Sequence, residues 1–390
     1  MRGGSCAVHT ISTCVRGRKV IDTDVLLIAL ADVQRDARTL NLARTLRADG
    51  LHVVVHAADP ADSAARSETM QVIPWKDPGG RAVKRWWSLR SSARHLAVRP
   101  RLVIAMDLFA LDAASIVARR CKAPLLYDMR EFYFALGPLE GRGLRQRLLA
   151  WHERQLLKHV DRVFVSGPLD AAIAQERFSL SKPAVVILNT PPYRDQVGSE
   201  LRARCGVADD VVLALYQGVV HKGRGLVPMF TAMSVDPRLH LAIIGDGPAE
   251  EAMRRIAREL GVEARVHWLG SVAYDDLHEL TCGADVGVCL IEPLSMSYEY
   301  ALPNKLFEYM MARVPVLATD LPALRAHIAD YPVGVLVDRA LRPENICAGV
   351  DALTSEPMRR RAVEACEGIR QLSYESQSAK AVVLCREYLT

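Results

Sequence analysis

The stretch ALPNKLFEYM (301–310) places a lysine and a glutamate at the beginning of an expected helix. Pro303 has the backbone dihedral of a first helical residue and needs no amide donor there. Lys305 and Asn304 lie three and four residues before Glu308, so all three share one face of the helix. This face can bind a phosphate through Lys305 and the helix N-terminus, and sugar hydroxyls through the Glu308 carboxylate. The alternative is a surface ion pair worth about 0.2–0.5 kcal/mol.

Two further turns carry glycines and follow expected strands, a combination that suits an anion. Their sequences are YQGVVHKGRGL (216–226) and AIIGDGPAEE (242–251). Glycine lets a ligand approach the backbone closely, and Lys or Arg can neutralise a phosphate. A basic surface loop is the alternative for the first turn, and a well-capped helix start for the second. The candidate anion-binding residues are Gly218, Lys222, Arg224, Gly245 and Gly247.

Charged residues also follow two buried stretches in the first half of the chain. AMDLFALD (105–112) supplies Asp107, and YDMREFYF (127–134) supplies Arg130 and Glu131. Acids and bases just beyond buried strands are candidates for catalysis, although a helix cap would use an aspartate in the same place. We expect Asp107, Arg130 and Glu131 to form the reactive part of a site in this half.

These candidates require strands that end beside one another. Short, continuously apolar stretches alternate with helical patterns along the chain, as in parallel sheets covered by helices on both faces. The sequence therefore predicts an α/β fold of two doubly wound, Rossmann-like domains that face a cleft. Ligands of such folds bind beyond the carboxyl ends of the strands. The expected strands are 25–30, 52–57, 102–106, 125–128, 163–166 and 185–188 in the first half, and 211–218, 239–245, 265–270, 286–291, 315–319 and 333–337 in the second.

The domain boundary is expected near residue 190, because NTPPYRDQVGS (189–199) is rich in proline and turn-forming residues. We expect a C-terminal helix that packs back on the N-terminal domain. The expected parts are a flexible extension (1–21), an N-terminal domain (22–190), a linker (191–202), a C-terminal domain (203–370) and the C-terminal helix (371–390).

The two halves carry opposite charge, which indicates different partners. Residues 1–195 hold 30 Lys and Arg against 19 Asp and Glu, and residues 196–390 hold 20 against 26. The most basic stretch is RAVKRWWSLRSSARHLAVRPR (81–101), with seven Lys and Arg and no acid. Two interpretations stay open: an interfacial helix on an anionic membrane, and a solvated helix with tryptophans on the core. Nucleic acid would also use such charge, but no recognition motif accompanies it, so we expect no nucleic-acid partner. The membrane interpretation assigns lipid contact to Lys84, Arg85, Trp86 and Trp87.

Several classes of protein are disfavoured by motifs that the sequence lacks. The first strand-to-helix turn, ALADVQRDAR, has no glycine, which disfavours a dinucleotide site, and no P-loop, G-x-S-x-G or H-E-x-x-H motif occurs. Nine scattered cysteines without a C-x-x-C pair suit reduced thiols. No apolar run reaches the ~18–20 residues of a membrane span. We therefore expect a cytoplasmic protein without a metal site.

Eight segments of the chain carry a resemblance. In the second half they are LYQGVVHKGRGL, LAIIGDGPAEEAMRRIARELG, RVHWLGSVAYDDL and YALPNKLFEYMMARVPVLATD, in this order. In the first half DVQRDARTLNLARTLRADGLHVVV, LLYDMREFYF, VDRVFVSGPLD and ILNTPP agree more loosely. Together they resemble glycosyltransferase family 4, the retaining enzymes of GT-B fold, and the first half its members with a D-x-H-E motif. The resemblance covers about residues 24–385.

The resemblance implies roles for several of the candidates. Arg224 corresponds to the family's phosphate-contacting lysine, and Glu308 to the glutamate that binds the donor ribose. Gly218 corresponds to the glycine after the first strand of the C-terminal domain, and residues 245–248 to the family's G-x-G-P turn.

Three positions depart from the family pattern. Val219 stands where the family has an arginine, and we expect Lys305 to replace that arginine in function. Tyr300 occupies the position of the first glutamate of the family's Glu-x7-Glu motif. Arg130 occupies the position of the histidine that faces the donor sugar in the family.

The resemblance implies transfer of a sugar from a nucleotide-diphosphate sugar, first of all a UDP-sugar, to an acceptor hydroxyl. The product would belong to cell-surface glycans, glycolipids or glycosylated natural products, and neither a metal nor another cofactor is expected. The acceptor would bind the N-terminal domain, and a lipid-linked acceptor would place the enzyme on the cytoplasmic face of the membrane. The expected donor-binding residues are Gly218, Lys222, Arg224, Gly245, Gly247, Tyr300, Asn304, Lys305 and Glu308.

Two alternatives keep the same fold. A nucleotide-sugar epimerase would need acid and base groups at the sugar but no acceptor pocket. A non-catalytic partner protein would keep the fold without the chemistry, and Tyr300 and Arg130 are the residues that favour it.

Overall fold

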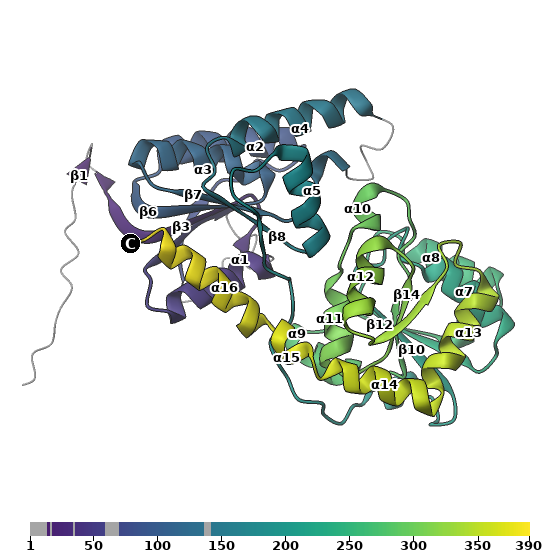
Figure 1. Cartoon of the computed structure of the whole chain (residues 1–390). Coiled ribbons are helices and arrows are strands. Elements are labelled where there is room, and N and C mark those ends of the chain that lie inside the picture. Colours follow the sequence, from purple (N-terminus) through teal and green to yellow (C-terminus); the bar gives the residue numbers. More distant parts are fainter. Residues whose placement is uncertain (1–13, 16–17, 34–35, 59–69, 136–141) are drawn as a thin grey trace, which may run out of the picture. The chain divides into compact units, whose positions relative to one another are not determined.

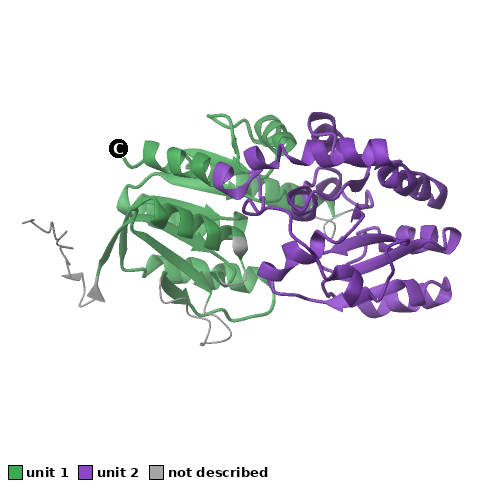
Figure 2. Ribbon diagram, turned by 90° about the horizontal axis from the view of Figure 1, so that it is seen from below, with its two compact units in different colours: residues 1–134, 142–187, 378–390 green, residues 135–141, 188–377 purple. Residues whose placement is uncertain are grey.

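The computed structural model describes residues 14–15, 18–33, 36–58, 70–135 and 142–390 (Figure 1). The chain forms two compact units, drawn in green and purple in Figure 2. Unit 1 comprises residues 1–134, 142–187 and 378–390, and unit 2 comprises residues 135–141 and 188–377. Most of the expected extension 1–21 lies outside the described residues. Its described part includes the antiparallel pair β1 (Cys14–Val15) and β2 (Arg18–Lys19).

Unit 1 is built on a seven-stranded parallel sheet in the order β5-β4-β3-β6-β7-β8-β9. Each expected strand of this half is present, and one strand, β5, was missed. Its sequence, QVIPW, contains a proline, and only its last residue, Trp75, is buried, a pattern that suits a sheet edge. The strands are β3 (Ile21–Ala29), β4 (Val53–Ala58), β5 (Gln71–Trp75), β6 (Val98–Met106), β7 (Leu125–Met129), β8 (Arg162–Val165) and β9 (Val185–Val186).

Helices cover both faces of this sheet. On one face, α1 and the segment 378–390 bury apolar residues such as Leu46 and Leu384 in one core with β3 and β4. α3 packs against β3, β6 and β7 and is in contact with α2 and α4. The helices of this unit are α1 (Ala37–Ala48), α2 (Ala82–Arg94), α3 (Leu108–Cys121), α4 (Gly143–Leu157), α5 (Pro168–Phe178) and most of α16 (Tyr374–Glu387), with most of the 3-10 turn η3 (Tyr133–Ala135).

Unit 2 contains a six-stranded parallel sheet in the order β12-β11-β10-β13-β14-β15, with every expected strand present. Its strands are β10 (Val212–Gln217), β11 (Leu239–Ile244), β12 (Val266–Gly270), β13 (Val286–Cys289), β14 (Val316–Thr319) and β15 (Gly334–Val337). Its helices are α6 (Leu201–Cys205), α7 (Leu226–Val235), α8 (Glu250–Glu259), α9 (Tyr274–Thr281), α10 (Met296–Glu299), α11 (Asn304–Met311), α12 (Pro322–Asp330), α13 (Pro343–Thr354), α14 (Glu356–Cys366) and α15 (Ile369–Leu372), with the 3-10 turn η5 (Glu263–Arg265).

In each sheet the chain adds strands first on one side of a central strand and then on the other side. β3 lies between β4 and β6, and β10 lies between β11 and β13, so the connections leave each central strand on opposite sides. At such a switch point the loops diverge and leave a crevice beyond the carboxyl ends of the strands. The predicted α/β class with two Rossmann-like sheets is therefore confirmed, and the crevices mark where ligands bind in this fold.

The structure also describes two segments that the sequence singled out. Residues 191–202 lie within unit 2, where Arg194 pairs with Asp275 and Leu201 is fully buried. The basic stretch 81–101 is not one helix, because α2 ends at Arg94 and β6 begins at Val98. The expected domain limits remain predictions.

A close contact fixes α11 against the sheet of unit 2. Gly287 on β13 lies under the ring of Tyr309, and a Cβ there would lie 2.4 Å from the Tyr309 Cγ. The ring cannot withdraw easily, because Tyr309 is fully buried and its hydroxyl donates to the Leu215 carbonyl at 2.8 Å. Only glycine therefore lets α11 approach β13 this closely.

Gly287→Ala should lower the free energy of unfolding by about 1–3 kcal/mol, because it forces overpacking beneath an anchored ring. Urea unfolding at equilibrium measures the change. Gly198→Ala is the matched control, since no atom lies within 4 Å of its added Cβ, and it should change stability by less than about 0.5 kcal/mol. Equal effects of the two substitutions would show that Tyr309 does not constrain this position.

Candidate functional site

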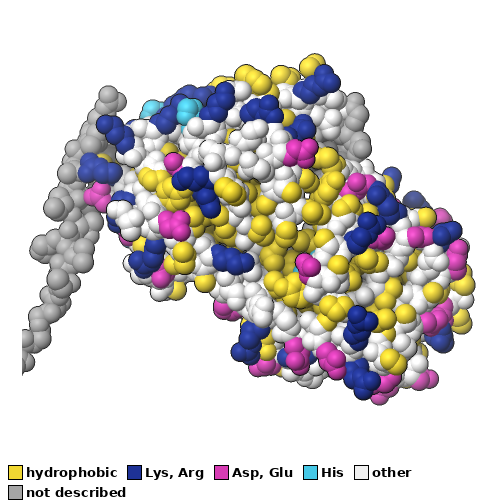
Figure 3. Space-filling model, in the orientation of Figure 1, with side chains coloured by type: hydrophobic (Ala, Val, Ile, Leu, Met, Phe, Trp, Pro, Cys, Tyr) yellow, Lys and Arg dark blue, Asp and Glu magenta, His cyan; other side chains and the backbone are white. Residues whose placement is uncertain are grey.

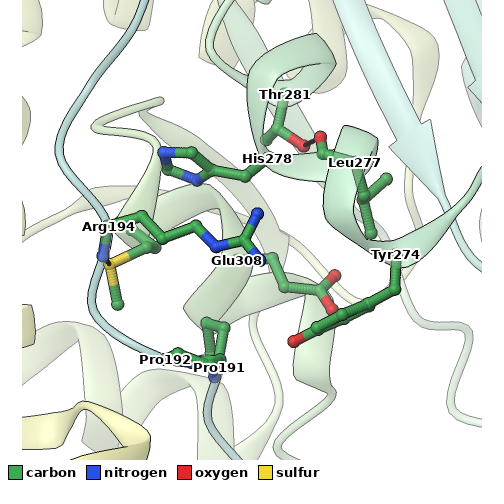
Figure 4. A pocket seen from close by; sticks show the side chains of 9 residues that line it. Pro191, Pro192, Arg194, Tyr274, Leu277, His278, Thr281 and Glu308 are labelled. Atoms are coloured by element: carbon green, nitrogen blue, oxygen red, sulfur yellow. Dashed lines mark hydrogen bonds between the residues drawn. The ribbon is translucent and has the colours of Figure 1, made fainter.

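The Glu308 side chain lines a pocket in unit 2 (Figure 4). Gln217, the last residue of β10, donates from Nε2 to the Glu308 carboxylate at 2.5 Å, and Gln217 is itself held by the Thr281 hydroxyl at 3.0 Å. Figure 4 shows the carboxylate beside the Tyr274 ring. The pocket, here called the Glu308 pocket, is lined by Pro191, Pro192, Arg194, Tyr274, Leu277, His278, Thr281, Glu308 and Met311.

Burial shapes the electrostatics of the Glu308 pocket. It raises the pKa of the Glu308 carboxyl, while the Gln217 hydrogen bond and Lys305 oppose the increase. Burial, with Glu308 as the next cause, raises the pKa of Tyr274 to about 12. The pocket thus holds a carboxylate that accepts one hydrogen bond and has further lone pairs for a ligand.

Lys305 points into the interior rather than toward solvent. Its side chain is 8% exposed, and its ammonium lies 3.7 Å from the centre of the Tyr216 ring and 3.5 Å from the Val288 carbonyl oxygen. Burial lowers its pKa to about 8, and Arg224 adds to the decrease. Among the described residues no ion pair joins Lys305 to Glu308 or to another acid, so the alternative of a surface ion pair is wrong.

The glycines of the loop after β10 serve mainly to pack it. Gly225 has a φ of +79°, and a Cβ there would lie 2.0 Å from the Leu290 carbonyl oxygen. A Cβ on Gly223 would meet the side chains of Leu294 and Tyr298. The Arg224 guanidinium lies 4.8 Å from the centre of the Tyr298 ring, and Lys222 is exposed. In the part of the chain that the structure describes, Arg224 has no acidic partner.

A second depression, the β11 groove, adjoins the Glu308 pocket and shares Tyr274 and Leu277 with it. Its floor is formed by loops that touch through their backbones: a Cβ on Gly245 would lie 2.1 Å from the Gly218 carbonyl oxygen. Gly218 has a φ of +118° and open space where a Cβ would stand. Gly247 packs in the same way against the Val220 carbonyl. The groove is lined by Gly218, Val219, Ile244, Gly245, Asp246, Ser271, Val272, Tyr274 and Leu277.

The other two predicted donor-binding residues lie near the start of α11. The exposed Asn304 side chain accepts a hydrogen bond from Asn189 at 2.9 Å. Tyr300 follows directly after α10 as its C-cap. Glu299, one residue before it, pairs with Arg339, so this acid does not stand in for the glutamate absent at 300.

In unit 1 the carboxyl ends of β3, β6 and β7 bring a charged cluster together. Asp128 is buried and receives two hydrogen bonds from the Arg38 guanidinium, at 2.7 and 2.8 Å. Arg130 donates to Asp128 at 3.1 Å, to Asp36 at 2.7 Å and to the Thr39 hydroxyl at 2.7 Å. Burial alone would raise the pKa of Asp128, but Arg38 and Arg130 outweigh it and hold the pKa below the usual value.

Asp107 belongs to the same edge of the sheet. Its amide donates to the Asp128 carbonyl at 3.2 Å, and its carboxylate caps α3 by accepting from the Ala110 amide at 3.0 Å. Its φ of +97° is unusual for a residue with a side chain. Burial raises the pKa of Asp107 to about 7, although Arg130 opposes this. Of the three predicted catalytic residues, Asp107 and Arg130 thus lie together, and Glu131 is exposed.

Two family models match the chain at these two sheets. Residues 197–367 match the model described as glycosyl transferases group 1, and residues 36–191 match the glycosyl transferase 4-like domain. The segment 197–367 thus belongs to the group 1 glycosyltransferases, and the segment 36–191 to the glycosyl transferase 4-like domains. The Glu308 pocket and the β11 groove lie within the first match, and the charged cluster of unit 1 lies within the second.

The curated relatives of this glycosyltransferase are distant. The 2-deoxystreptamine N-acetyl-D-glucosaminyltransferase of Streptomyces fradiae is 27% identical over 272 residues, which are 66% of this chain and 63% of that relative. Mannosylfructose-phosphate synthase of Agrobacterium fabrum is 26% identical over 165 residues, which are 38% of this chain and 35% of the relative. The chain therefore spans less than two thirds of the length of these relatives.

Solved structures resemble the glycosyltransferase over nearly its whole length. Sucrose-phosphate synthase from Thermosynechococcus elongatus matches with a TM-score of 0.76 at 18% identity, over 94% of this chain and 98% of the other. HepE of Anabaena in complex with UDP-glucose matches with a TM-score of 0.71 at 15% identity, over 94% and 99%. At such identities the likeness shows the fold, which is the GT-B architecture of two Rossmann-like domains.

Several residues of the glycosyltransferase's candidate sites were not predicted. Gln217, which orients Glu308, and Tyr274, which both depressions share, stood inside segments that carried the family resemblance. Asp36 and Arg38 follow β3 in the polar turn DVQRDAR, for which the sequence indicated no ligand-binding role. Gln217 could have been found from its position, because it is a polar residue at the end of a buried strand. In this fold ligands bind beyond the carboxyl ends of the strands.

The four predicted lipid contacts have different surroundings on α2. Arg85 is held by Asp77 through an ion pair, and Trp86 packs edge-on against His152. Trp87 is half-exposed, and Lys84 is exposed. None of the helices in the described ranges combines the length and hydrophobicity that a membrane crossing requires.

The buried ammonium makes stability depend on pH. Because the pKa of Lys305 is about 8 in the folded chain and 10.5 ordinarily, the unfolded chain binds more protons between these values. The free energy of unfolding should then rise with pH in this window, by up to about 1.4 kcal/mol per unit, relative to Lys305→Met. Urea unfolding of both proteins at about pH 7 and about pH 10 measures the difference.

Lys222→Met is the control, because Lys222 is exposed. The stability difference between wild type and this variant should be the same at both pH values. If the stability difference between wild type and Lys305→Met were also the same at both pH values, the Lys305 ammonium would not be buried in the folded chain.

Proposed function

We propose that this chain transfers a sugar from a nucleotide-diphosphate sugar to an acceptor hydroxyl, and that the donor binds unit 2 at the Glu308 pocket. The observation that carries the proposal is the Glu308 carboxylate, oriented by Gln217 and without a cation partner among the described residues. A carboxylate with open lone pairs is the natural acceptor for two neighbouring hydroxyls, such as those of a ribose.

The leaving diphosphate would lie between Arg224 and the start of α11. Arg224 has no acidic partner in the described ranges, and the Lys305 ammonium is buried without one. A buried unpaired charge is unfavourable, so an anionic ligand at this place would relieve it. Positive groups here would stabilise the charge that develops on the leaving group during transfer. Exposed Lys222 and the Asn304 side chain would complete the rim of this site.

The base would occupy the β11 groove, whose glycines Gly218 and Gly245 leave the backbone accessible. The groove and the Glu308 pocket meet at Tyr274, so one nucleotide can span both. HepE, which shares the fold, has been solved with UDP-glucose, and this supports a UDP-sugar as the donor. The resemblance to glycosyltransferase family 4 supports transfer with retention of the anomeric configuration. It also supports a place for Tyr300, shortly before the start of α11, near the donor sugar.

The acceptor would bind unit 1 at the charged cluster. Asp107, with a pKa near 7, suits proton transfer at an acceptor hydroxyl. Arg130 already donates to two carboxylates and a hydroxyl, so we assign it a positioning role, with Glu131 at the exposed rim. A lipid-linked acceptor on the cytoplasmic face of a membrane would agree with the basic character of the first half.

Glu308→Gln should weaken UDP binding by about 10- to 100-fold, because a charge-assisted hydrogen bond to the ribose is lost. Glutamine keeps the shape of the side chain and can still bond Gln217, so the fold should persist. Isothermal titration calorimetry with UDP measures the affinity, and release of UDP from a panel of UDP-sugars with candidate acceptors measures transfer.

Glu299→Gln is the matched control, since this nearby carboxylate pairs with Arg339 and does not line the pocket. It should leave the UDP affinity unchanged. An unchanged affinity of Glu308→Gln for UDP would show that Glu308 does not bind the ribose. Epimerised sugar formed from the donor alone would favour an epimerase, and tight UDP binding without turnover across the panel would favour a non-catalytic partner.

A further inference from the structure

Helix α4 carries a stripe of large apolar side chains on its outer surface. Leu144, Leu148 and Trp151 are spaced by four and three residues, so they lie on one face of the helix, and they are 74%, 57% and 60% exposed. Three such residues in a row differ from apolar residues scattered singly over a surface, which need no explanation.

The opposite face of α4 already provides the packing that holds the helix. Glu153 and Leu156 are buried, and the Glu153 carboxylate accepts a hydrogen bond from the buried Tyr127 hydroxyl at 2.8 Å. The apolar stripe is therefore not used by the core of unit 1.

The surface on both sides of the stripe is basic. Exposed Arg147, Arg154 and Lys158 follow one flank of the helix, and Arg145 lies on the other. The one acid within α4 is Glu153, which is buried. Figure 3 shows hydrophobic and Lys or Arg side chains next to one another along this edge of unit 1. The outward half of α4 therefore combines apolar residues with positive charges that pair with no acid among the described residues.

Helix α2 extends this surface. Its exposed apolar residues are Val83 and Trp87, one turn apart. Trp86 connects the two helices, because its ring packs on Trp87 at 5.0 Å and on His152 of α4 at 5.8 Å between centres. α2 contains no acid, and Lys84 is exposed. The two helices thus form one patch, which we define as Val83, Trp87, Leu144, Leu148 and Trp151 with the basic residues around them.

We propose that this two-helix patch docks on an anionic lipid bilayer, with the leucines and tryptophans in the headgroup region and the arginines at the phosphates. An amphipathic helix with leucine and tryptophan between basic flanks binds a bilayer in this way, and long basic side chains reach the phosphates while their stems stay apolar. The proposal deepens the membrane association included in the proposed function, and α4 rather than the Trp86–Trp87 pair supplies most of the lipid contact. It does not depend on the donor site.

Charge decides between a bilayer and the other occupants of such a patch. A second copy of the same surface would bring the basic flanks together, and like charges repel. A nucleic acid would use the arginines but would leave Leu144 and Leu148 without a function. An anionic bilayer can bury the apolar stripe and bind the basic residues on its flanks through its headgroups.

Co-sedimentation of the full chain with vesicles of phosphatidylcholine and phosphatidylglycerol tests the proposal. The wild type should bind these vesicles, bind phosphatidylcholine vesicles far less, and dissociate as salt is raised. Leu148→Ser combined with Trp151→Ser should lower the partition coefficient by about 10- to 100-fold, because large apolar groups leave the bilayer.

Val383→Ser is the control, because Val383 is an exposed apolar residue elsewhere in unit 1, and it should bind vesicles as the wild type does. Arg147→Glu keeps the stripe and reverses one flanking charge, so it should also weaken binding. The proposal would be overturned if the wild type did not bind the vesicles, or if the double serine variant bound them fully. It would also be overturned if the wild type were a dimer in solution and the double serine variant a monomer. The double serine variant should bind UDP as the wild type does. A loss of vesicle binding would then not be due to damage at the donor site.

Discussion

The close approach of α11 to β13, with the Tyr309 ring over Gly287, determines where the functional side chains of unit 2 lie. α11 carries both Lys305 and Glu308, and its distance from the sheet decides how deep each side chain reaches. Lys305 extends inward to the Tyr216 ring, while Glu308 reaches Gln217 at the carboxyl end of β10. A helix held farther from the sheet would leave Glu308 without its partner and Lys305 in solvent.

The two units use charge in different ways. In unit 1 the buried Asp128 is compensated by Arg38 and Arg130, so the cluster forms a closed network with a fixed geometry. In unit 2 the charges near the Glu308 pocket are left open, because neither Lys305 nor Arg224 has an acidic partner among the described residues. The open carboxylate in the pocket and the open cations near it suit a ligand that brings phosphates and hydroxyls together, as the proposed donor does.

The fold could be predicted from the sequence far better than the site. Continuous apolar stretches marked each expected strand, since parallel strands are buried on both faces, and β5 was missed because an edge strand with a proline lacks that signal. The helical spacing placed Lys305 and Glu308 on one face, but it could not show that they diverge. Their neighbours Tyr216 and Gln217 come from another strand, and sequence distance along α11 carries no information about them.

The apolar stripe on α4 was missed for a related reason. Leu144, Leu148 and Trp151 have the spacing of an ordinary buried face, and the sequence alone cannot say which face of a helix the core uses. The buried bond between Glu153 and Tyr127 fixes that choice and turns the stripe outward. An acid in the middle of the helix thus marked the buried side, the reverse of the usual pattern.

The most direct test of the donor site is a crystal structure of the chain with UDP bound. We expect both ribose hydroxyls within about 3 Å of the Glu308 carboxylate, the base in the β11 groove beside Tyr274, and the diphosphate next to Arg224 and Lys305. A nucleotide whose ribose lies away from Glu308, with the carboxylate bonded to Gln217 alone, would contradict the central claim.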